Sequence, residues 1–389
     1  MMRVVASVIT QWKNAFKFNS LPKKSKRIVF YSEGKPSSPH LGPLIQELIN
    51  RGRDVQILMS EQTDPLANLT SPKARVTSHW IGSGTARTWV YSSLESSVFI
   101  TTTPDIETMH LKRSKHGGYY IYTHHSMISM HMGYRSEAFD YFDAVFCTGP
   151  YQIEETRARE SRYNLRKKKL VKLGYCQLDT LRTSNKKHVA DSTDNNQKST
   201  KTVLLAPTWG ENSILPMCGE KVINILLESG YQVITRPHPE TTRKSPELIR
   251  RINERFGSHD RFKLDLCTTN DLSMQISNLM ISDWSGVAME YAYGFEKPVL
   301  FIDLPRKVNN PAYLEIDIEP IEVSVRNEIG NVLELRNIDC IPNAISNLLS
   351  TGNERIGKIR ASRDLRVFNQ GASASIGAEF IEKIADEDQ

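Results

Sequence analysis

The stretch SDWSGVAME, which begins at Ser282, carries the side chains best suited to bind a nucleotide. A short apolar run ends at Ser282 and Asp283, and a turn with Ser285 and Gly286 leads into a helical pattern. The first backbone amides of a helix lack intrahelical partners and lie at the positive end of the helix dipole, so they attract phosphate. Glu290, just over one helical turn further on, could reach ribose hydroxyls. The stretch therefore predicts a nucleotide-diphosphate site.

A second group of candidate residues forms the turn Arg236, Pro237, His238 and Pro239 at the end of a predicted strand. The two prolines restrict the backbone and would hold the guanidinium and the imidazole in place. Arginine can bind phosphate oxygens through two parallel hydrogen bonds, and both groups can stabilise the charge on a departing phosphate. We expect Arg236 and His238 at a pyrophosphate leaving group. The alternative is a rigid turn without a catalytic role.

Histidines are concentrated after another predicted strand, 119–123, where His124, His125 and His131 lie within eight residues. Ligands of parallel sheets collect where strands end, and histidine can act as a general base near neutral pH. We therefore expect a catalytic or substrate-binding role for His124 or His125. A structural polar loop is the first alternative. A metal site is disfavoured, because neighbouring side chains of an extended segment point apart and no Asp, Glu or Cys has a familiar ligand spacing.

Alternating strands and helices must position these groups, and the pattern predicts an α/β fold with two Rossmann-like domains. The predicted strands are 28–31, 55–59, 97–102, 119–123, 143–148, 203–209, 233–236, 264–266, 279–281 and 298–303. The predicted helices include 40–51, 220–229, 271–277 and 372–385. The loop after the first strand lacks both GxGxxG and GxxxxGK[ST], which argues against a dinucleotide or Walker site of the usual kind.

The composition along the chain suggests where the domains begin and end. We expect a basic amphipathic segment at 1–26, an acceptor-side domain at 27–182, a polar linker at 183–202, a donor-nucleotide domain at 203–360, and a terminal helix at 361–389 that packs back across the domains.

The segment 1–26 has an apolar helical face, made of Val5, Val8, Ile9, Trp12 and Phe16, followed by a lysine-rich stretch. A secretion signal would place its charges before the apolar residues, so the order is wrong for one. The segment fits an interfacial helix at an anionic membrane surface. The alternative is an ordinary helix that packs on its own domain.

The bulk numbers exclude several classes of protein. Among 389 residues, 39% are hydrophobic and 24% charged, and the net charge of +6 is too small to indicate nucleic acid binding. The five scattered cysteines, without CxxC spacing, argue against disulfides or structural zinc. No apolar run approaches the length of a membrane span. We expect a cytoplasmic protein, peripheral on the inner face of the membrane.

Several motifs together resemble the CDP-glycerol glycerophosphotransferase family. They are APTW at 206–209, RPHP at 236–239 and SDWSGVAMEYAYGFEKPVLF at 282–301, supported by THHS at 123–126. The resemblance covers about 27–303. It implies a GT-B-type fold, with the donor nucleotide in the second domain and the acceptor in the first. It also implies transfer of a polyol phosphate, most simply glycerol phosphate, from a CDP-alcohol to an acceptor hydroxyl in a lipid-linked or polymeric cell-surface acceptor such as teichoic acid or capsule.

The resemblance also assigns roles to residues of this chain. It implies that His124 or His125 is the base, that Arg236 and His238 contact phosphate, and that Asp283, Ser285 and Gly286 form the phosphate loop. The remaining predicted substrate-binding residues are Thr208, Trp209, Ser282 and Glu290. Many members of the family carry a second serine where this chain has Gly286.

Two other functions fit the same motifs. One is a GT-B glycosyltransferase that uses a nucleotide sugar for capsule or lipopolysaccharide, and the other is a catalytically silent nucleotide-binding assembly protein. None of the stretches that carry the candidate residues contains a DxD motif, so we expect neither a metal nor another cofactor.

Overall fold

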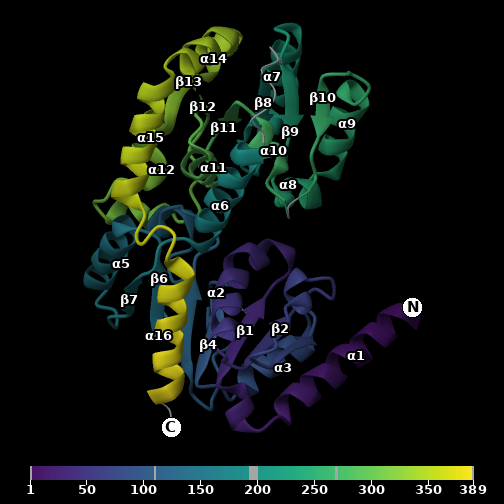
Figure 1. The fold of residues 1–389 in the computed structure, drawn as a ribbon, viewed down its shortest axis with the longest axis vertical. Helices are drawn as coiled ribbons and strands as arrows, with labels where there is room; N and C mark the ends of the chain where they lie inside the picture. Colours follow the sequence, from purple (N-terminus) through teal and green to yellow (C-terminus); the bar gives the residue numbers. More distant parts are fainter. Residues whose placement is uncertain (1, 109–110, 192–199, 268–269, 388–389) are drawn as a thin grey trace.

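The computed structural model describes residues 2–108, 111–191, 200–267 and 270–387. They form two α/β domains, each built on a parallel sheet (Figure 1). The first sheet has the strand order β3-β2-β1-β4-β5-β6-β7, and the second has the order β10-β9-β8-β11-β12-β13. The predicted α/β class with two Rossmann-like domains is confirmed.

The strands of the first sheet are β1 (Ile28–Ser32), β2 (Val55–Met59), β3 (Val76–Trp80), β4 (Val98–Thr101), β5 (Tyr119–Thr123), β6 (Ala144–Cys147) and β7 (Lys169–Lys172). Those of the second are β8 (Thr202–Leu205), β9 (Gln232–Thr235), β10 (Phe262–Leu264), β11 (Leu279–Ser282), β12 (Val299–Asp303) and β13 (Gly330–Glu334).

The α-helices are α1 (Met2–Asn19), α2 (Ser38–Asn50), α3 (Thr85–Ser93), α4 (Met130–Gly133), α5 (Pro150–Arg162), α6 (Cys176–Asp191), α7 (Ile214–Glu228), α8 (Pro239–Lys244), α9 (Pro246–Phe256), α10 (Leu272–Ile276), α11 (Val287–Phe295), α12 (Ile321–Ser324), α13 (Arg326–Ile329), α14 (Ile341–Ser350), α15 (Gly352–Arg366) and α16 (Ser373–Glu387). Short 3-10 helices are η1 (Lys23–Lys26), η2 (Lys35–Ser37), η3 (Pro65–Asn68), η4 (Pro311–Glu315) and η5 (Leu335–Cys340).

Burial explains which strands the sequence predicted. Every residue of β1, β2, β6, β8 and β11 is buried, because helices cover both faces of a parallel sheet, and such strands consist mostly of apolar residues. The edge strands β3, β7 and β13 are partly exposed and carry polar residues, so no apolar run marked them and they were not predicted. The predicted strand 203–209 ends earlier, at Leu205, since Pro207 cannot donate to a ladder.

Each sheet has one point where the order of its strands reverses, between β1 and β4 in the first domain and between β8 and β11 in the second. Helices leave neighbouring strands toward opposite faces at such a point, and a crevice opens beyond the carboxyl ends of those strands. The loops after β8 and β11 contain the APTW and SDWSG motifs, and the loop after β5, next to β4, contains the histidines. The topology therefore gathers the candidate residues at two such ends.

The segment between the sheets differs from the prediction. The predicted linker 183–202 is helical as far as Asp191, within α6, and its residues 192–199 lie outside those that the structure describes. The buried Leu178 and Leu181, three residues apart, hold α6 against α11 of the second domain. At the end of the chain, α15 spans the predicted boundary at 360, and α16 packs on α2 of the first domain (Figure 1).

Polar contacts join the two domains beside the histidine loop. Ser129 of the first domain donates hydrogen bonds from its amide and its hydroxyl to Glu322 Oε1, at 3.1 and 3.2 Å. His131 is buried, with Nε2 at 3.0 Å from the Ile318 carbonyl oxygen and Nδ1 at 3.3 Å from Glu155 Oε2. The third histidine of the cluster thus has a structural environment at the domain junction.

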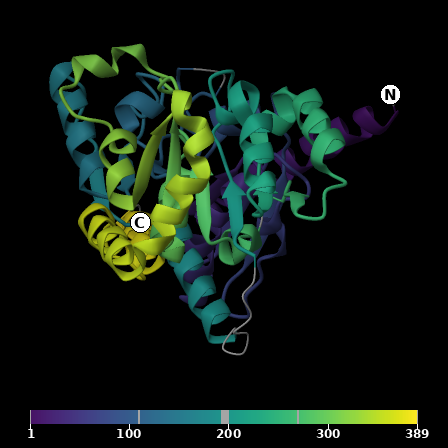
Figure 2. The ribbon, with the colours of Figure 1, turned by 90° about the horizontal axis from the view of Figure 1, so that it is seen from above.

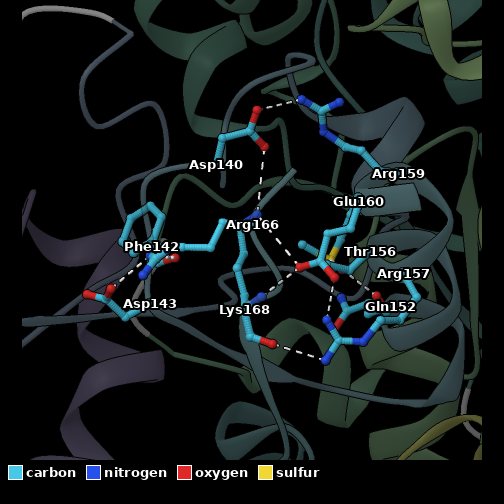
Figure 3. A network of polar contacts seen from close by, with 11 residues as sticks. Asp140, Phe142, Asp143, Gln152, Thr156, Arg157, Arg159, Glu160, Arg166 and Lys168 are labelled. Atoms are coloured by element: carbon cyan, nitrogen blue, oxygen red, sulfur yellow. Dashed lines mark hydrogen bonds and ion pairs between the residues drawn. The ribbon is translucent and has the colours of Figure 1, made fainter. Parts of the chain in front are cut away.

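Several charged residues of α5 and of the segment that follows it pair with carboxylates of the first domain. Figure 3 shows Arg159 paired with Asp140 at 2.7 Å and Arg166 paired with Asp143 at 2.8 Å. Lys168 is buried beside Asp140 and Glu160, and burial lowers the pKa of its ammonium group. This network fixes α5 to β6 and β7.

The N-terminal helix α1 packs by only part of its length and extends beyond the body of the first domain (Figures 1 and 2). Ala15 and Phe18 are buried, whereas Val5, Val8, Ile9 and Phe16 are exposed. Among the lysines that follow, Lys26 is buried and donates a hydrogen bond to the Asn19 carbonyl oxygen, so it does not belong to a free basic patch. None of the helices in the described ranges is long and apolar enough to cross a membrane.

Candidate active site

The turn after β11 lies directly against the histidine loop of the first domain. A Cβ atom added to Gly286 would lie 2.2 Å from Ser126 Oγ and 3.0 Å from Ile128 Cγ2. Real carbon atoms do not approach so closely, so only glycine fits here unless the loop moves. The predicted phosphate turn and the predicted base are therefore close neighbours, although they belong to different domains.

Ser282 and Asp283 support this turn from within. Asp283 Oδ1 accepts a hydrogen bond from the Thr208 amide at 2.7 Å, and Oδ2 accepts one from the Ile214 amide at 3.0 Å. Ser282 Oγ donates to the Ala206 carbonyl oxygen at 2.7 Å. Both side chains are buried, and burial raises the pKa of Asp283 while the amides of Thr208 and Ile214 act in the opposite sense. The geometry gives both residues a positioning role rather than direct contact with a substrate.

The loop after β8 is held beside two lysines that the motifs did not reveal. Lys307 Nζ donates a hydrogen bond to Thr208 Oγ1 at 2.9 Å and lies 3.9 Å from the centre of the Trp209 ring. Lys244 Nζ lies 4.1 Å from the centre of the same ring. Burial lowers the pKa of Lys307 to about 8. Lys307 closely follows β12, so its position after a strand was the signal that could have found it.

His238 has a defined orientation in the RPHP turn. Its Nδ1 accepts a hydrogen bond from the Glu240 amide at 3.1 Å, which caps α8. That bond requires an unprotonated Nδ1, so the neutral ring carries its proton on Nε2 and can donate from there. Burial, together with the positive charge of Lys307, lowers the pKa of His238 to about 4. His238 is therefore a neutral hydrogen-bond donor at pH 7.

Arg236 lies at the end of β9, next to a hydroxyl and a carboxylate. Its Nη1 donates to Ser273 Oγ at 3.1 Å and lies 3.9 Å from Asp265 Oδ2. Its charge also acts on Glu290, the predicted ribose ligand. The RPHP turn and the helix α11 are thus near one another, as a shared nucleotide would require.

The two neighbouring histidines have opposite environments. His124 is buried among aromatic rings, 4.9 Å from the ring of Tyr122, and neither of its nitrogens has a hydrogen-bond partner in the described part of the chain. Burial lowers the pKa of His124 to about 3. His125 is exposed, and its Nδ1 lies 3.2 Å from the Thr102 carbonyl oxygen.

The contact with Thr102 decides the tautomer of His125. A carbonyl oxygen can only accept, so Nδ1 donates and Nε2 keeps a free lone pair. The surrounding protein lowers the pKa of His125, and the Thr102 carbonyl partly offsets this effect. Of the two candidates, only His125 has the exposure and the tautomer of a base.

Further residues connect His125 with Glu290, and sequence reasoning missed them. His40, at the start of α2, lies 6.4 Å from His125 and 5.5 Å from Tyr175, measured between ring centres. The Tyr175 hydroxyl donates to Glu290 Oε1 at 2.8 Å. Burial raises the pKa of Glu290 to about 7. The position of His40 after the first strand and its loop was the only available signal.

On the side of the second domain, the junction between the domains carries positively charged side chains. Lys244 and Lys307 lie over the Trp209 ring, which neighbours His238, and Arg236 belongs to the same turn as His238. The carboxylate of Asp283 accepts from two backbone amides of the protein itself. Within the described residues, no three side chains of His, Cys, Asp or Glu form a group that could hold a metal ion. The arrangement can bind an anion and accept a proton next to it.

Comparisons with known proteins agree with this geometry. The family described as CDP-Glycerol:Poly(glycerophosphate) glycerophosphotransferase matches residues 14–305, more than half of the chain. Among solved structures, the wall teichoic acid polymerase TagF is similar with a TM-score of 0.63 and 18% identity, covering 100% of this chain and 97% of that chain. The UDP-GlcNAc 2-epimerase of Methanocaldococcus jannaschii is similar with a TM-score of 0.57 and 16% identity, covering 92% of this chain and 99% of that chain.

No curated protein sequence matches the chain. The structural likenesses, at these identities, establish a shared fold. The family match extends from within α1 to the loop after β12 and includes all the motifs described above. The chain is thus a transferase that belongs to the CDP-glycerol:poly(glycerophosphate) glycerophosphotransferase family.

Proposed function

We propose that this transferase moves glycerol phosphate from CDP-glycerol to an acceptor hydroxyl, with His125 as the base and the second domain as the donor site. One observation carries the assignment of the base: His125 exposes a free Nε2 in the loop whose next residue, Ser126, contacts Gly286. A base and a phosphate-binding turn are then adjacent. Glycerophosphoryl transfer needs this juxtaposition, because the attacking hydroxyl must lose its proton beside the phosphorus.

The step is an in-line displacement at the phosphorus that carries the glycerol. The acceptor oxygen forms a bond to this phosphorus, the bond to the bridging oxygen breaks, and CMP departs with that oxygen. The proton of the acceptor hydroxyl moves to Nε2 of His125. A lowered pKa keeps His125 unprotonated at pH 7, so it is ready to accept the proton.

The second domain stabilises the charge that develops on the phosphates. His238 donates from Nε2–H, while Arg236 and Lys307 supply positive charge, and the turn of Ser285 and Gly286 presents the start of α11. Thr208 and Trp209 position Lys307 at this place. Ser282 and Asp283 keep the turn in shape. No step requires a metal ion.

Glu290 is the proposed ligand of the ribose hydroxyls. Its Oε1 accepts from Tyr175, and its second oxygen remains for a ribose hydroxyl. A carboxyl group with a pKa of about 7 can either accept or donate such a bond near neutral pH. The acceptor would approach from the first domain and would be a lipid-linked or polymeric polyol phosphate.

Exposed apolar side chains on α1 support the proposal that the protein binds to the membrane surface. Val5, Val8, Ile9 and Phe16 protrude from the first domain, and exposed lysines follow them. Such a helix can insert its apolar side chains at the boundary of an anionic membrane. We propose a cytoplasmic protein that binds the inner face of the membrane through residues 1–26, near lipid-linked acceptors.

A donor panel tests the function. The purified protein should release CMP from CDP-glycerol in the presence of acceptor, measured by mass spectrometry. Release of a nucleoside diphosphate from a nucleotide sugar would instead identify a glycosyltransferase, and nucleotide binding without turnover would identify an assembly protein. The variant His238→Ala should lose about 100-fold in kcat, since it removes a donor to the departing phosphate. Turnover close to that of the wild type would reject this role of His238.

A further inference from the structure

A hollow of about 470 Å³ lies beside the end of β12. Trp284, the second residue of the phosphate turn, forms one wall, and Asp303, Arg306 and Arg326 supply its charged groups. The residues that follow β9, among them His238, lie on the other side of β11 in the sheet order. The hollow is therefore separate from the donor side of the turn, and its volume is within the range of small-molecule sites.

Arg326 places a buried positive charge in the wall of the hollow. Only 5% of the residue is exposed, and its guanidinium lies 4.1 Å from the centre of the Trp284 ring. Nη1 donates to Asp303 Oδ1 at 2.8 Å, whereas Nε has no hydrogen-bond partner among the described residues. A desolvated cation with an unused donor is costly unless further negative charge is near.

Arg306 adds a second cation at the rim. It is exposed, lies 5.6 Å from the centre of the Trp284 ring, and donates to the Tyr313 hydroxyl at 3.1 Å. No carboxylate in the described part of the chain pairs with it. The hollow thus contains two guanidinium groups and one carboxylate, which leaves an excess of one positive charge. This balance favours an anion.

The loop that follows β12 divides its cations between two places. Lys307 contacts Thr208 and Trp209 on the donor side, while the preceding residue, Arg306, lines the hollow. A substrate chain bound near the turn of Ser285 and Gly286 could therefore extend past Trp284 to Arg306.

We propose that this hollow binds a phosphodiester unit of the polyol phosphate acceptor, one or more repeats away from the reacting hydroxyl. The inference rests on the proposed function, because that function makes the acceptor a chain with regularly spaced phosphates. Arg306 holds the phosphate oxygens, with Arg326 contributing charge from behind, and Asp303 accepts hydrogen bonds from polyol hydroxyls. Such a subsite would favour a polymeric acceptor over a single polyol phosphate.

Direct binding tests the subsite without any turnover. A short synthetic oligomer of glycerol phosphate is titrated into the wild-type protein and into Arg306→Ala by calorimetry. The loss of a charged hydrogen-bond partner should weaken binding about tenfold. Arg306→Lys should restore part of the affinity, since it keeps the charge but not the paired geometry. The matched control Arg336→Ala removes an arginine whose side chain is 80% exposed and pairs with Glu334, and it should bind like the wild type.

A second variant changes a different residue that lines the hollow. Val332→Asp adds a negative charge at a partly exposed position of β13 that lines the hollow, and it should also weaken binding of the oligomer. In initial-rate measurements, Arg306→Ala and Val332→Asp should each raise the KM for the oligomer and leave the KM for the donor unchanged.

Three results would overturn the proposal. The oligomer could bind Arg306→Ala as tightly as the wild type, inorganic phosphate could bind the wild type as well as the oligomer does, or the variants could change the KM for CDP-glycerol instead. Failure of the proposed function would be seen differently, as a wild-type protein that releases no CMP. The calorimetric result would still report on the hollow in that case.

Discussion

The two domains contribute to the junction in different ways. In the second domain, the polar groups around the phosphate turn already have protein partners: Asp283 holds two amides, His238 accepts from Glu240, and Lys307 donates to Thr208. In the first domain, Nδ1 of His125 lies 3.2 Å from the Thr102 carbonyl oxygen and 3.3 Å from the Tyr122 hydroxyl, and the residue is exposed. The difference suggests a rigid donor site and a single reactive group opposite it. Preorganised charge is effective because it need not reorient during the reaction.

The largest effect on rate should come from the first domain. His125→Ala should lower kcat about 1,000-fold, because general-base catalysis contributes on this scale. His124→Phe should cost far less, since a ring of similar shape fills the same aromatic pocket. Single-turnover measurements with saturating CDP-glycerol compare the two variants, with exposed His116→Ala as the control. If His124→Phe were the more damaging substitution, the contrast between the two histidines would be wrong.

The second domain should respond through stability. Asp283→Ala leaves the amides of Thr208 and Ile214 buried without an acceptor, which should lower the free energy of unfolding by about 3 kcal/mol. Urea denaturation measures the loss. The control Asp339→Ala removes an exposed partner of Lys221 and should change stability little. An unchanged unfolding midpoint for Asp283→Ala would mean that the donor turn does not depend on this carboxylate.

The contact between the domains can be tested at Gly286. Gly286→Ala should push Ser126 away and displace the adjacent His125, and we expect about a tenfold loss in kcat, since small displacements of reacting groups are costly. The double variant with Ser126→Gly should recover most of this loss, because the closest atom is then absent. Equal activity of the single and double variants would show that the approach of Ser126 does not control the position of the base.

The smallest effect concerns pH and the buried pair of carboxyl groups at the junction. Burial, together with the charge of the nearby Glu155, raises the pKa of Glu322 to about 7. A carboxyl group whose pKa is raised by folding stabilises the protein fully below its unfolded value of 4.5, and this contribution is lost as the pH rises through 7.

Glu322→Gln removes that titration but keeps an oxygen to accept from Ser129. We compare the Tm of the variant with that of the wild type at each pH. The difference between the two Tm values should be about 3 °C more favourable to the variant at pH 8 than at pH 5. Calorimetric scans at both pH values measure this difference. The other titratable groups that face Glu322 are His131, Glu155 and Tyr151. A wild type and a variant with parallel pH profiles would exclude Glu322 as the titrating group.

The sequence was sufficient for the architecture and for the approximate place of the site. Buried strands such as β1 and β11 appear as apolar runs, and the motifs follow strand ends, where parallel sheets bind ligands. The family was recognisable from the same motifs and is confirmed. The edge strands and the helical part of the predicted linker were missed, because partial burial leaves no clear periodicity.

Only the tertiary structure decided what each residue does. His124 and His125 are neighbours in sequence, but successive side chains of an extended segment point in opposite directions, and one packs in the core while the other reaches the junction. Asp283 had the chemistry of a ligand, yet folding brings two amides to its oxygens and makes it a support. Lys307, His40 and Arg326 carry no motif, since contacts between distant segments create their roles.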